Sequence, residues 1–105
     1  MKYKLIFTVK EIRGKCPLYK PGDKIVIDGF YVNTKESKNV CMHAFSAMLS
    51  LVSLLSHGFS TKKLGIGLRE DVGYLHCPDP GPPRTKGGTV LFEIRRVKKM
   101  QNNDR

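Results

Sequence analysis

Apolar and polar side chains alternate near both ends of this chain, and that alternation limits its fold more than any other feature. Residues 2–10 and 89–97 each carry apolar residues at every second position, with mostly polar residues between them. These apolar residues are Tyr3, Leu5, Phe7 and Val9 in the first segment, and Val90, Phe92 and Ile94 in the second. A period of two is that of a β-strand with one buried face. Both segments are therefore predicted to be strands of a sheet that must be covered on one side.

Residues 40–57 can supply this cover. Their apolar members recur at steps of three and four, which places them on one face of a helix. They are Cys41, Ala44, Phe45, Met48, Val52 and Leu55. Gly58 predicts the end of the helix. Shorter apolar runs at residues 24–27 and 72–77 predict two further strands, the first of them after the turn signal Pro21-Gly22-Asp23.

The predicted fold is α+β, with a small antiparallel sheet packed against one main amphipathic helix. A length of 105 residues suits one domain. We place that domain at residues 1–99 and expect residues 100–105 to be a flexible polar tail. The chain begins with a strand pattern rather than a secretory signal, and its longest apolar run is too short to cross a bilayer. We therefore expect a cytoplasmic protein that does not enter the membrane.

The formal net charge of +10 at pH 7 would attract phosphate backbones and acidic partners. The charge is spread along the chain, however, as in proteins where it serves only solubility. One functional hypothesis is a basic binding module for nucleic acid or for an acidic protein. Its binding residues would be Lys2, Lys4, Lys10, Arg95, Arg96, Lys98 and Lys99. Another is a structural or assembly subunit that associates through sheet edges, with copies of itself or with a protein partner.

Three cysteines support a different hypothesis. Cys16, Cys41 and Cys77 each fall at a boundary between predicted elements. An odd number argues against a complete set of disulfides, and in a reducing compartment they would be thiols or ligands. Three thiolates could hold zinc or an iron–sulfur cluster, or could form a redox thiol site. The C-x-x-C spacing typical of metal sites is absent, and free cysteines are also common as small buried apolar residues.

The histidines beside these cysteines are not expected to be ligands. Two residues along a helix correspond to a rotation of about 200°, so His43 should face away from Cys41. His76 and Cys77 alternate sides if they lie on a strand. At Cys41 the helix dipole favours a thiolate whereas burial opposes it, and the sequence leaves that balance open. No paired carboxylates, nucleotide loop or catalytic base stand out, so no enzymatic activity is assigned.

Three ordered motifs resemble those of a family of uncharacterised bacterial and archaeal proteins of about this length. The motifs are Gly14-Lys15-Cys16-Pro17 before Pro21-Gly22-Asp23, then Val40-Cys41 with Ala44, then Cys77-Pro78-Asp79-Pro80 before the segment 90–96. The resemblance implies no assigned activity, but it suggests that the three cysteines belong to one constellation. Family members often carry Gly-His shortly after the first cysteine, where this chain has Leu18-Tyr19. A histidine ligand at that place would be missing here.

Overall fold

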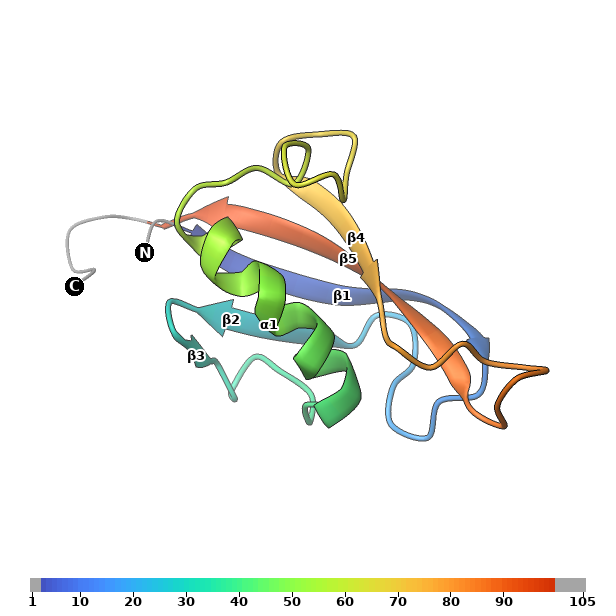
Figure 1. Cartoon of the computed structure of the whole chain (residues 1–105). Helices are drawn as coiled ribbons and strands as arrows, with labels where there is room; N and C mark the ends of the chain where they lie inside the picture. The colour runs from blue at the N-terminus through green and yellow to red at the C-terminus, as the bar shows by residue number, and fades with distance from the viewer. Residues whose placement is uncertain (1–2, 100–105) are drawn as a thin grey trace.

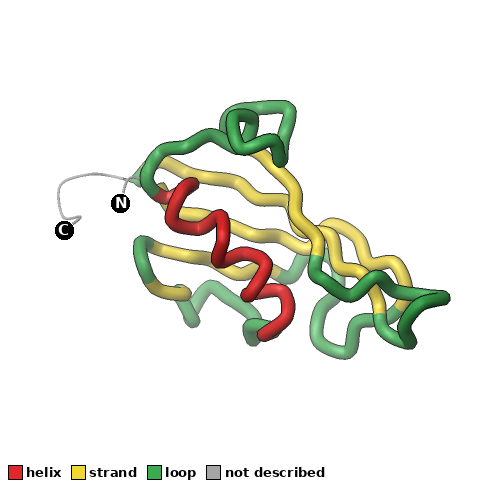
Figure 2. Tube along the Cα trace, in the orientation of Figure 1, coloured by secondary structure: helices red, strands yellow, loops and turns green. Residues whose placement is uncertain are grey.

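The protein, described at residues 3–99 by a computed structural model, is a five-stranded antiparallel sheet with one helix on one of its faces (Figure 1). The strands are β1 (Tyr3–Gly14), β2 (Lys24–Asp28), β3 (Tyr31–Val32), β4 (Val72–His76) and β5 (Gly88–Lys98). They lie in the order β3-β2-β1-β5-β4, and each neighbouring pair is antiparallel. The helix α1 (Met42–Ser56) crosses the sheet obliquely (Figure 2). The predicted α+β fold is therefore confirmed.

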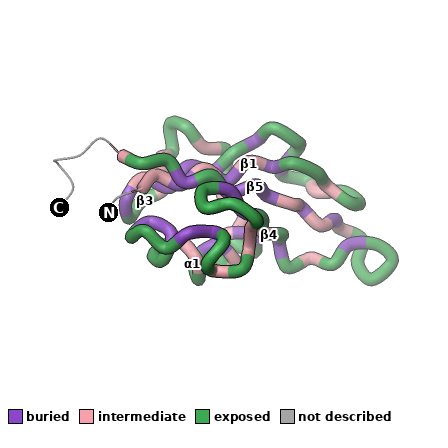
Figure 3. The backbone as a smooth tube through the Cα atoms, turned by 90° about the horizontal axis from the view of Figure 1, so that it is seen from above, coloured by how far each residue is buried: buried purple, intermediate pink, exposed green. Residues whose placement is uncertain are grey.

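The core lies between α1 and the face of the sheet that the alternation predicted to be buried. Leu5, Phe7 and Ile94 are fully buried on the two central strands. Met48 and Leu55 of α1 are fully buried against them. Buried stretches, purple in Figure 3, alternate with exposed ones along the chain. Burial of each such side chain contributes about 1.5–3 kcal/mol. The opposite face of the sheet carries no helix within the described part of the chain, which is why its strands alternate rather than being apolar throughout.

The β1–β5 pair extends past the end of the helix. Its register runs from Tyr3 opposite Lys98 to Gly14 opposite Gly88, with an irregularity between Val9 and Glu11. A bulge of this kind increases the local twist of a strand pair. The pairing of Gly14 with Gly88 brings two connections to the same end of the molecule: residues 15–23, which follow β1, and residues 77–87, which precede β5 (Figure 1).

Two boundaries differ from the sequence prediction in ways that affect the site. The strand predicted at residues 2–10 continues to Gly14 because β5 pairs with it over its whole length. The helix begins at Met42 rather than at residue 40, so Cys41 is its N-cap, with extended dihedrals of φ −71° and ψ 128°. The short strand β3 was not predicted, because two residues are too few to show a period.

Within residues 3–99, no helix is both long and apolar enough to span a membrane. The predicted tail at residues 100–105 lies outside the described residues.

Candidate thiol site

All three cysteines line one cavity of about 270 Å³ at the end of the molecule where the β1–β5 pair projects past the helix. Cys16 comes from the connection after β1, Cys41 from the start of α1, and Cys77 from the residue after β4. Tyr19, His43 and Asp79 line the same cavity. The cavity thus combines three sulfur atoms with a phenol, an imidazole and a carboxylate.

Cys16 is half-buried in a tight turn that its own sulfur stabilises. The backbone N–H of Tyr19 donates to the Cys16 Sγ at 3.4 Å. Pro17 follows the cysteine and fixes one backbone dihedral of this turn. The sulfur therefore acts as a hydrogen-bond acceptor within this turn.

Tyr19 joins this turn to the start of α1. Its hydroxyl accepts a hydrogen bond from the N–H of Cys41 and donates one to the carbonyl of Asn39, both at 2.8 Å. Its ring is 5% exposed and meets the ring of Phe92 edge-on, with centroids 5.9 Å apart. Burial raises the pKa of Tyr19 and outweighs the hydrogen bond from the Cys41 N–H, which lowers it. The phenol therefore keeps its proton at neutral pH and remains a donor.

Cys77 is the most enclosed of the three cysteines, with 7% of its surface exposed. Its Sγ accepts the N–H of Val90 at 3.3 Å and lies 3.6 Å from the carbonyl oxygen of Gly88, to which the thiol donates. Both partners belong to β5, so the position of this sulfur is fixed by the sheet.

Asp79 organises the Pro- and Gly-rich connection that follows Cys77. Its carboxylate accepts hydrogen bonds from the Thr85 hydroxyl and from the N–H of Gly81, the latter at 2.8 Å. The Thr85 hydrogen bond, followed by that of Gly81, holds the pKa of Asp79 below its ordinary value, and the charge of His43 adds to this effect. A Cβ atom at Gly87 would collide with the Asp79 carboxylate, so a larger residue there would displace that side chain from its hydrogen bonds.

His43, which is exposed, lines the cavity although it was not predicted as part of the site. A helical rotation between Cys41 and His43 would have placed their side chains on opposite sides. Cys41 precedes the helix in an extended conformation, so that rotation does not apply, and both residues line the cavity. Tyr19 was not predicted as part of the site; its place directly after Cys16-Pro17-Leu18 was the available signal.

The other two histidines lie outside the cavity. His57 is at the opposite end of α1, where a ring nitrogen lies 2.8 Å from the carbonyl oxygen of Ser53. His76 is exposed on β4, with a ring nitrogen 2.8 Å from the carbonyl oxygen of Cys77. The expectation that His76 points away from the thiol of Cys77 fits this arrangement.

As the side chains stand, no three His, Cys, Asp or Glu residues among residues 3–99 are gathered closely enough to hold a metal ion. The metal assignment of Cys16, Cys41 and Cys77 therefore stays a prediction.

Several of the basic residues predicted to bind nucleic acid are already paired with carboxylates. Lys4 lies 3.4 Å from Glu36, and both Lys10 and Arg95 contact Glu93. Burial alone would raise the pKa of Glu93, but the hydrogen bond and charge of Arg95 outweigh it and lower the pKa. These pairs reduce the free positive charge on the open face of the sheet.

The basic cluster at the end of β5 is divided between the two faces of the sheet. Arg96 is 9% exposed, forms an ion pair with Asp71 at 2.8 Å and stacks on the ring of Tyr3. Its burial removes it from any nucleic-acid surface. Lys99 pairs with Asp28 at 3.1 Å, whereas Lys98 is exposed. Lys2 lies outside the described residues.

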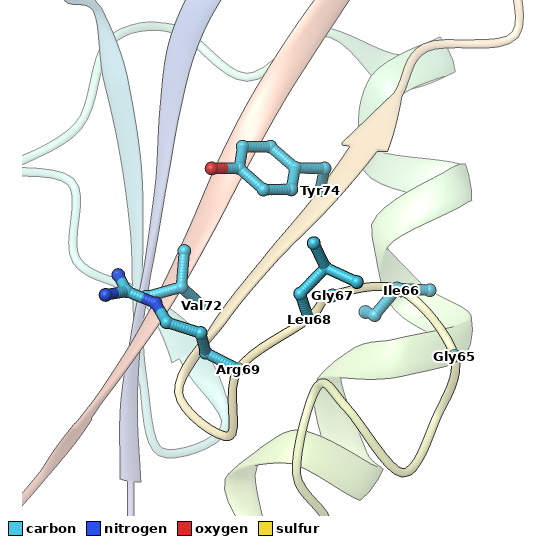
Figure 4. A pocket seen from close by; sticks show the side chains of 7 residues that line it. All are labelled: Gly65, Ile66, Gly67, Leu68, Arg69, Val72 and Tyr74. Atoms are coloured by element: carbon cyan, nitrogen blue, oxygen red, sulfur yellow. The ribbon is translucent and has the colours of Figure 1, made fainter.

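A second hollow, of about 660 Å³, lies between the connection 65–69 and β4 (Figure 4). It is lined by small and apolar residues together with Arg69 and Tyr74, and Leu68 at its rim is almost fully exposed. Neither cysteine nor carboxylate contributes to its lining. Side chains that can act as ligands or nucleophiles therefore line the cysteine cavity and not this second hollow.

No protein-family model, no curated protein and no solved structure matches this chain. The resemblance to the family of short prokaryotic proteins stays a prediction.

Proposed function

We propose that this protein binds a thiophilic metal ion through the thiolates of Cys16, Cys41 and Cys77. The observation that carries the proposal is that these residues, which are far apart in sequence, line a single cavity. Thiolates are soft ligands that favour zinc, copper(I) and iron–sulfur clusters over hard cations. A metal bound by the three would tie together the connections that carry them.

The three sulfurs differ in how firmly the structure holds them. Cys16 accepts the N–H of Tyr19, and Cys77 both accepts the N–H of Val90 and donates to the carbonyl of Gly88. Cys77 is fixed by β5, while Cys16 and Cys41 are half-buried on connections where other rotamers can be adopted. Metal binding would therefore require these two side chains to turn towards Cys77.

Three protein ligands leave one position open in a tetrahedral zinc site. His43 is the candidate for that position because it lines the cavity, and Asp79 can orient its ring. Metal-bound histidines commonly have a carboxylate partner of this kind. Bound in this way, a metal would serve as a structural clamp; with the position free, it could act on a small ligand.

The alternatives have weaker support. A nucleic-acid module would need its basic residues free, but Lys4, Lys10, Arg95 and Arg96 are paired with carboxylates. An assembly subunit would use the edges β3 and β4, and β3 is only two residues long. Neither hypothesis explains why the three cysteines line one cavity.

The test is metal analysis of protein purified without oxygen, followed by titration of the metal-free form with Co²⁺ as a spectroscopic substitute for zinc. We expect one equivalent to bind, with the absorption of a thiolate-ligated ion. Replacing Cys16 or Cys41 by Ser should weaken binding by more than the roughly 10- to 100-fold that loss of an outer partner costs.

The helix provides a matched histidine control. His43→Ala should weaken Co²⁺ binding, whereas His57→Ala, at the other end of α1, should leave it unchanged. Absence of stoichiometric binding, together with thiols that react equally fast with and without added metal, would refute the proposal.

A further inference from the structure

A cationic hollow opens beside the cysteine cavity. This hollow, of about 740 Å³, shares five lining residues with the cavity, and one of them is Cys16. Three lysines line it: Lys15, Lys20 and Lys86. Lys15 also belongs to the wall of the cysteine cavity. A molecule held in the hollow therefore lies against Cys16.

These three lysines differ from the basic residues of the sheet surface. All three are exposed, and within residues 3–99 no carboxylate lies within ion-pair distance of them. Lys4, in contrast, forms an ion pair with Glu36, and Lys10 and Arg95 share Glu93. Part of the net charge of +10 is thus left free at the cysteine end of the molecule.

Two nearby carboxylates reduce this charge, but neither forms an ion pair with the three lysines. The Asp23 carboxylate accepts the backbone N–H of Lys20 at 3.0 Å and is 9% exposed. Asp79 lies in the cysteine cavity, where Thr85 and Gly81 bind its carboxylate. A concave surface lined by charges of one sign concentrates ligands of the opposite sign and raises their association rate.

We propose that this hollow binds the anionic group of a small disulfide and thereby brings its S–S bond to Cys16. The inference goes beyond the proposed function, because it concerns the Cys16 thiol when no metal ion is bound to it. With a disulfide, the Cys16 thiolate attacks one sulfur of the ligand. A new S–S bond forms to Cys16, the ligand's own S–S bond breaks, and the departing half leaves as a thiolate. The ligand itself is the oxidant, so the exchange needs no other reagent.

The test compares two aliphatic disulfides of opposite charge, 3,3′-dithiodipropionate and cystamine, on the metal-free protein. The rate of Cys16 modification is read by peptide mass spectrometry, and each rate is divided by that of the same reagent with 2-mercaptoethanol. We expect the normalised rate of the anionic reagent to exceed that of the cationic one by roughly tenfold or more at low salt. The two rates should converge near 1 M salt, where the screening length is about 3 Å.

Two triple variants isolate the contribution of the hollow. One replaces Lys15, Lys20 and Lys86 by Gln, and the other replaces Lys35, Lys62 and Lys63, which are exposed elsewhere. Both variants lose the same net charge. The anionic preference should disappear in the first and persist in the second.

Equal loss in both variants would attribute the preference to net charge alone and overturn the inference, as would equal normalised rates in the wild-type protein. This outcome is separable from the metal test. An anionic preference without metal binding would support the hollow and refute the metal site. Metal binding without an anionic preference would support the metal site and refute the hollow.

Discussion

The backbone N–H of Cys41 donates a 2.8 Å hydrogen bond to the hydroxyl of Tyr19, a residue 22 positions earlier in the chain. Through this bond and the one from Tyr19 to the carbonyl of Asn39, a single buried phenol holds the start of α1 against the Cys16 turn. The cap residue of the helix makes no side-chain capping hydrogen bond of its own. Tyr19 is therefore central to the geometry of the cysteine cavity.

Replacing Tyr19 by Phe should destabilise the protein by about 1–3 kcal/mol, because a donor and an acceptor lose their partner in a partly buried place. Urea unfolding monitored by circular dichroism measures this loss. Tyr74→Phe is the matched control, since that hydroxyl is at an exposed position and makes only a 3.3 Å contact with Glu93. Equal costs for the two substitutions would contradict the role given to Tyr19.

The same phenol predicts a dependence of stability on alkaline pH. Burial raises the pKa of Tyr19 above its ordinary value of 10.0. Its protonated form therefore contributes stability that is fully present below the pKa of the unfolded chain and is lost as the pH rises through the folded-state pKa. The free energies of unfolding of the wild type and Tyr19→Phe should thus approach each other above pH 10. Parallel pH profiles would exclude this contribution.

Asp79 should titrate at a lower pH than an ordinary aspartate, and Thr85→Val should raise its pKa because the largest cause of the shift is removed. The lowered pKa means that Asp79 contributes stability present above the unfolded-state pKa and lost as the pH falls through the folded-state value. Carboxyl chemical shifts followed by NMR give both pKa values. Thr34→Val, at another exposed threonine, should leave the Asp79 titration unchanged.

Gly87→Ala should disturb the 77–87 connection, because the added Cβ meets the Asp79 carboxylate. A double-mutant cycle with Asp79→Ala tests the cause directly. If the carboxylate is the obstacle, the loss of stability caused by Gly87→Ala should be smaller in the Asp79→Ala background. If the stability losses of the two substitutions in thermal unfolding are strictly additive, the Asp79 carboxylate is not the cause of the Gly87→Ala effect.

The cysteines illustrate why part of the site could be read from the sequence and part could not. Their positions at the boundaries between elements followed from periodicity, since the strand and helix patterns end near Cys16, Cys41 and Cys77. The predicted helix start lay two residues too early, so the helical rotation used between Cys41 and His43 does not apply. The side-chain direction at a helix terminus depends on a single pair of dihedrals, which residue type does not determine.

The alternation of apolar residues, together with one apolar helical stripe, was enough to determine an α+β fold with a one-sided core, because burial acts on patterns local to each segment. The tertiary structure alone decided that the three cysteines share a cavity. Their convergence depends on the register of β1 against β5, which sets Gly14 opposite Gly88, and on the Tyr19 bridge to Cys41. Both are pairings between distant parts of the chain, and such pairings are selected by the packing of the whole molecule rather than by any one segment.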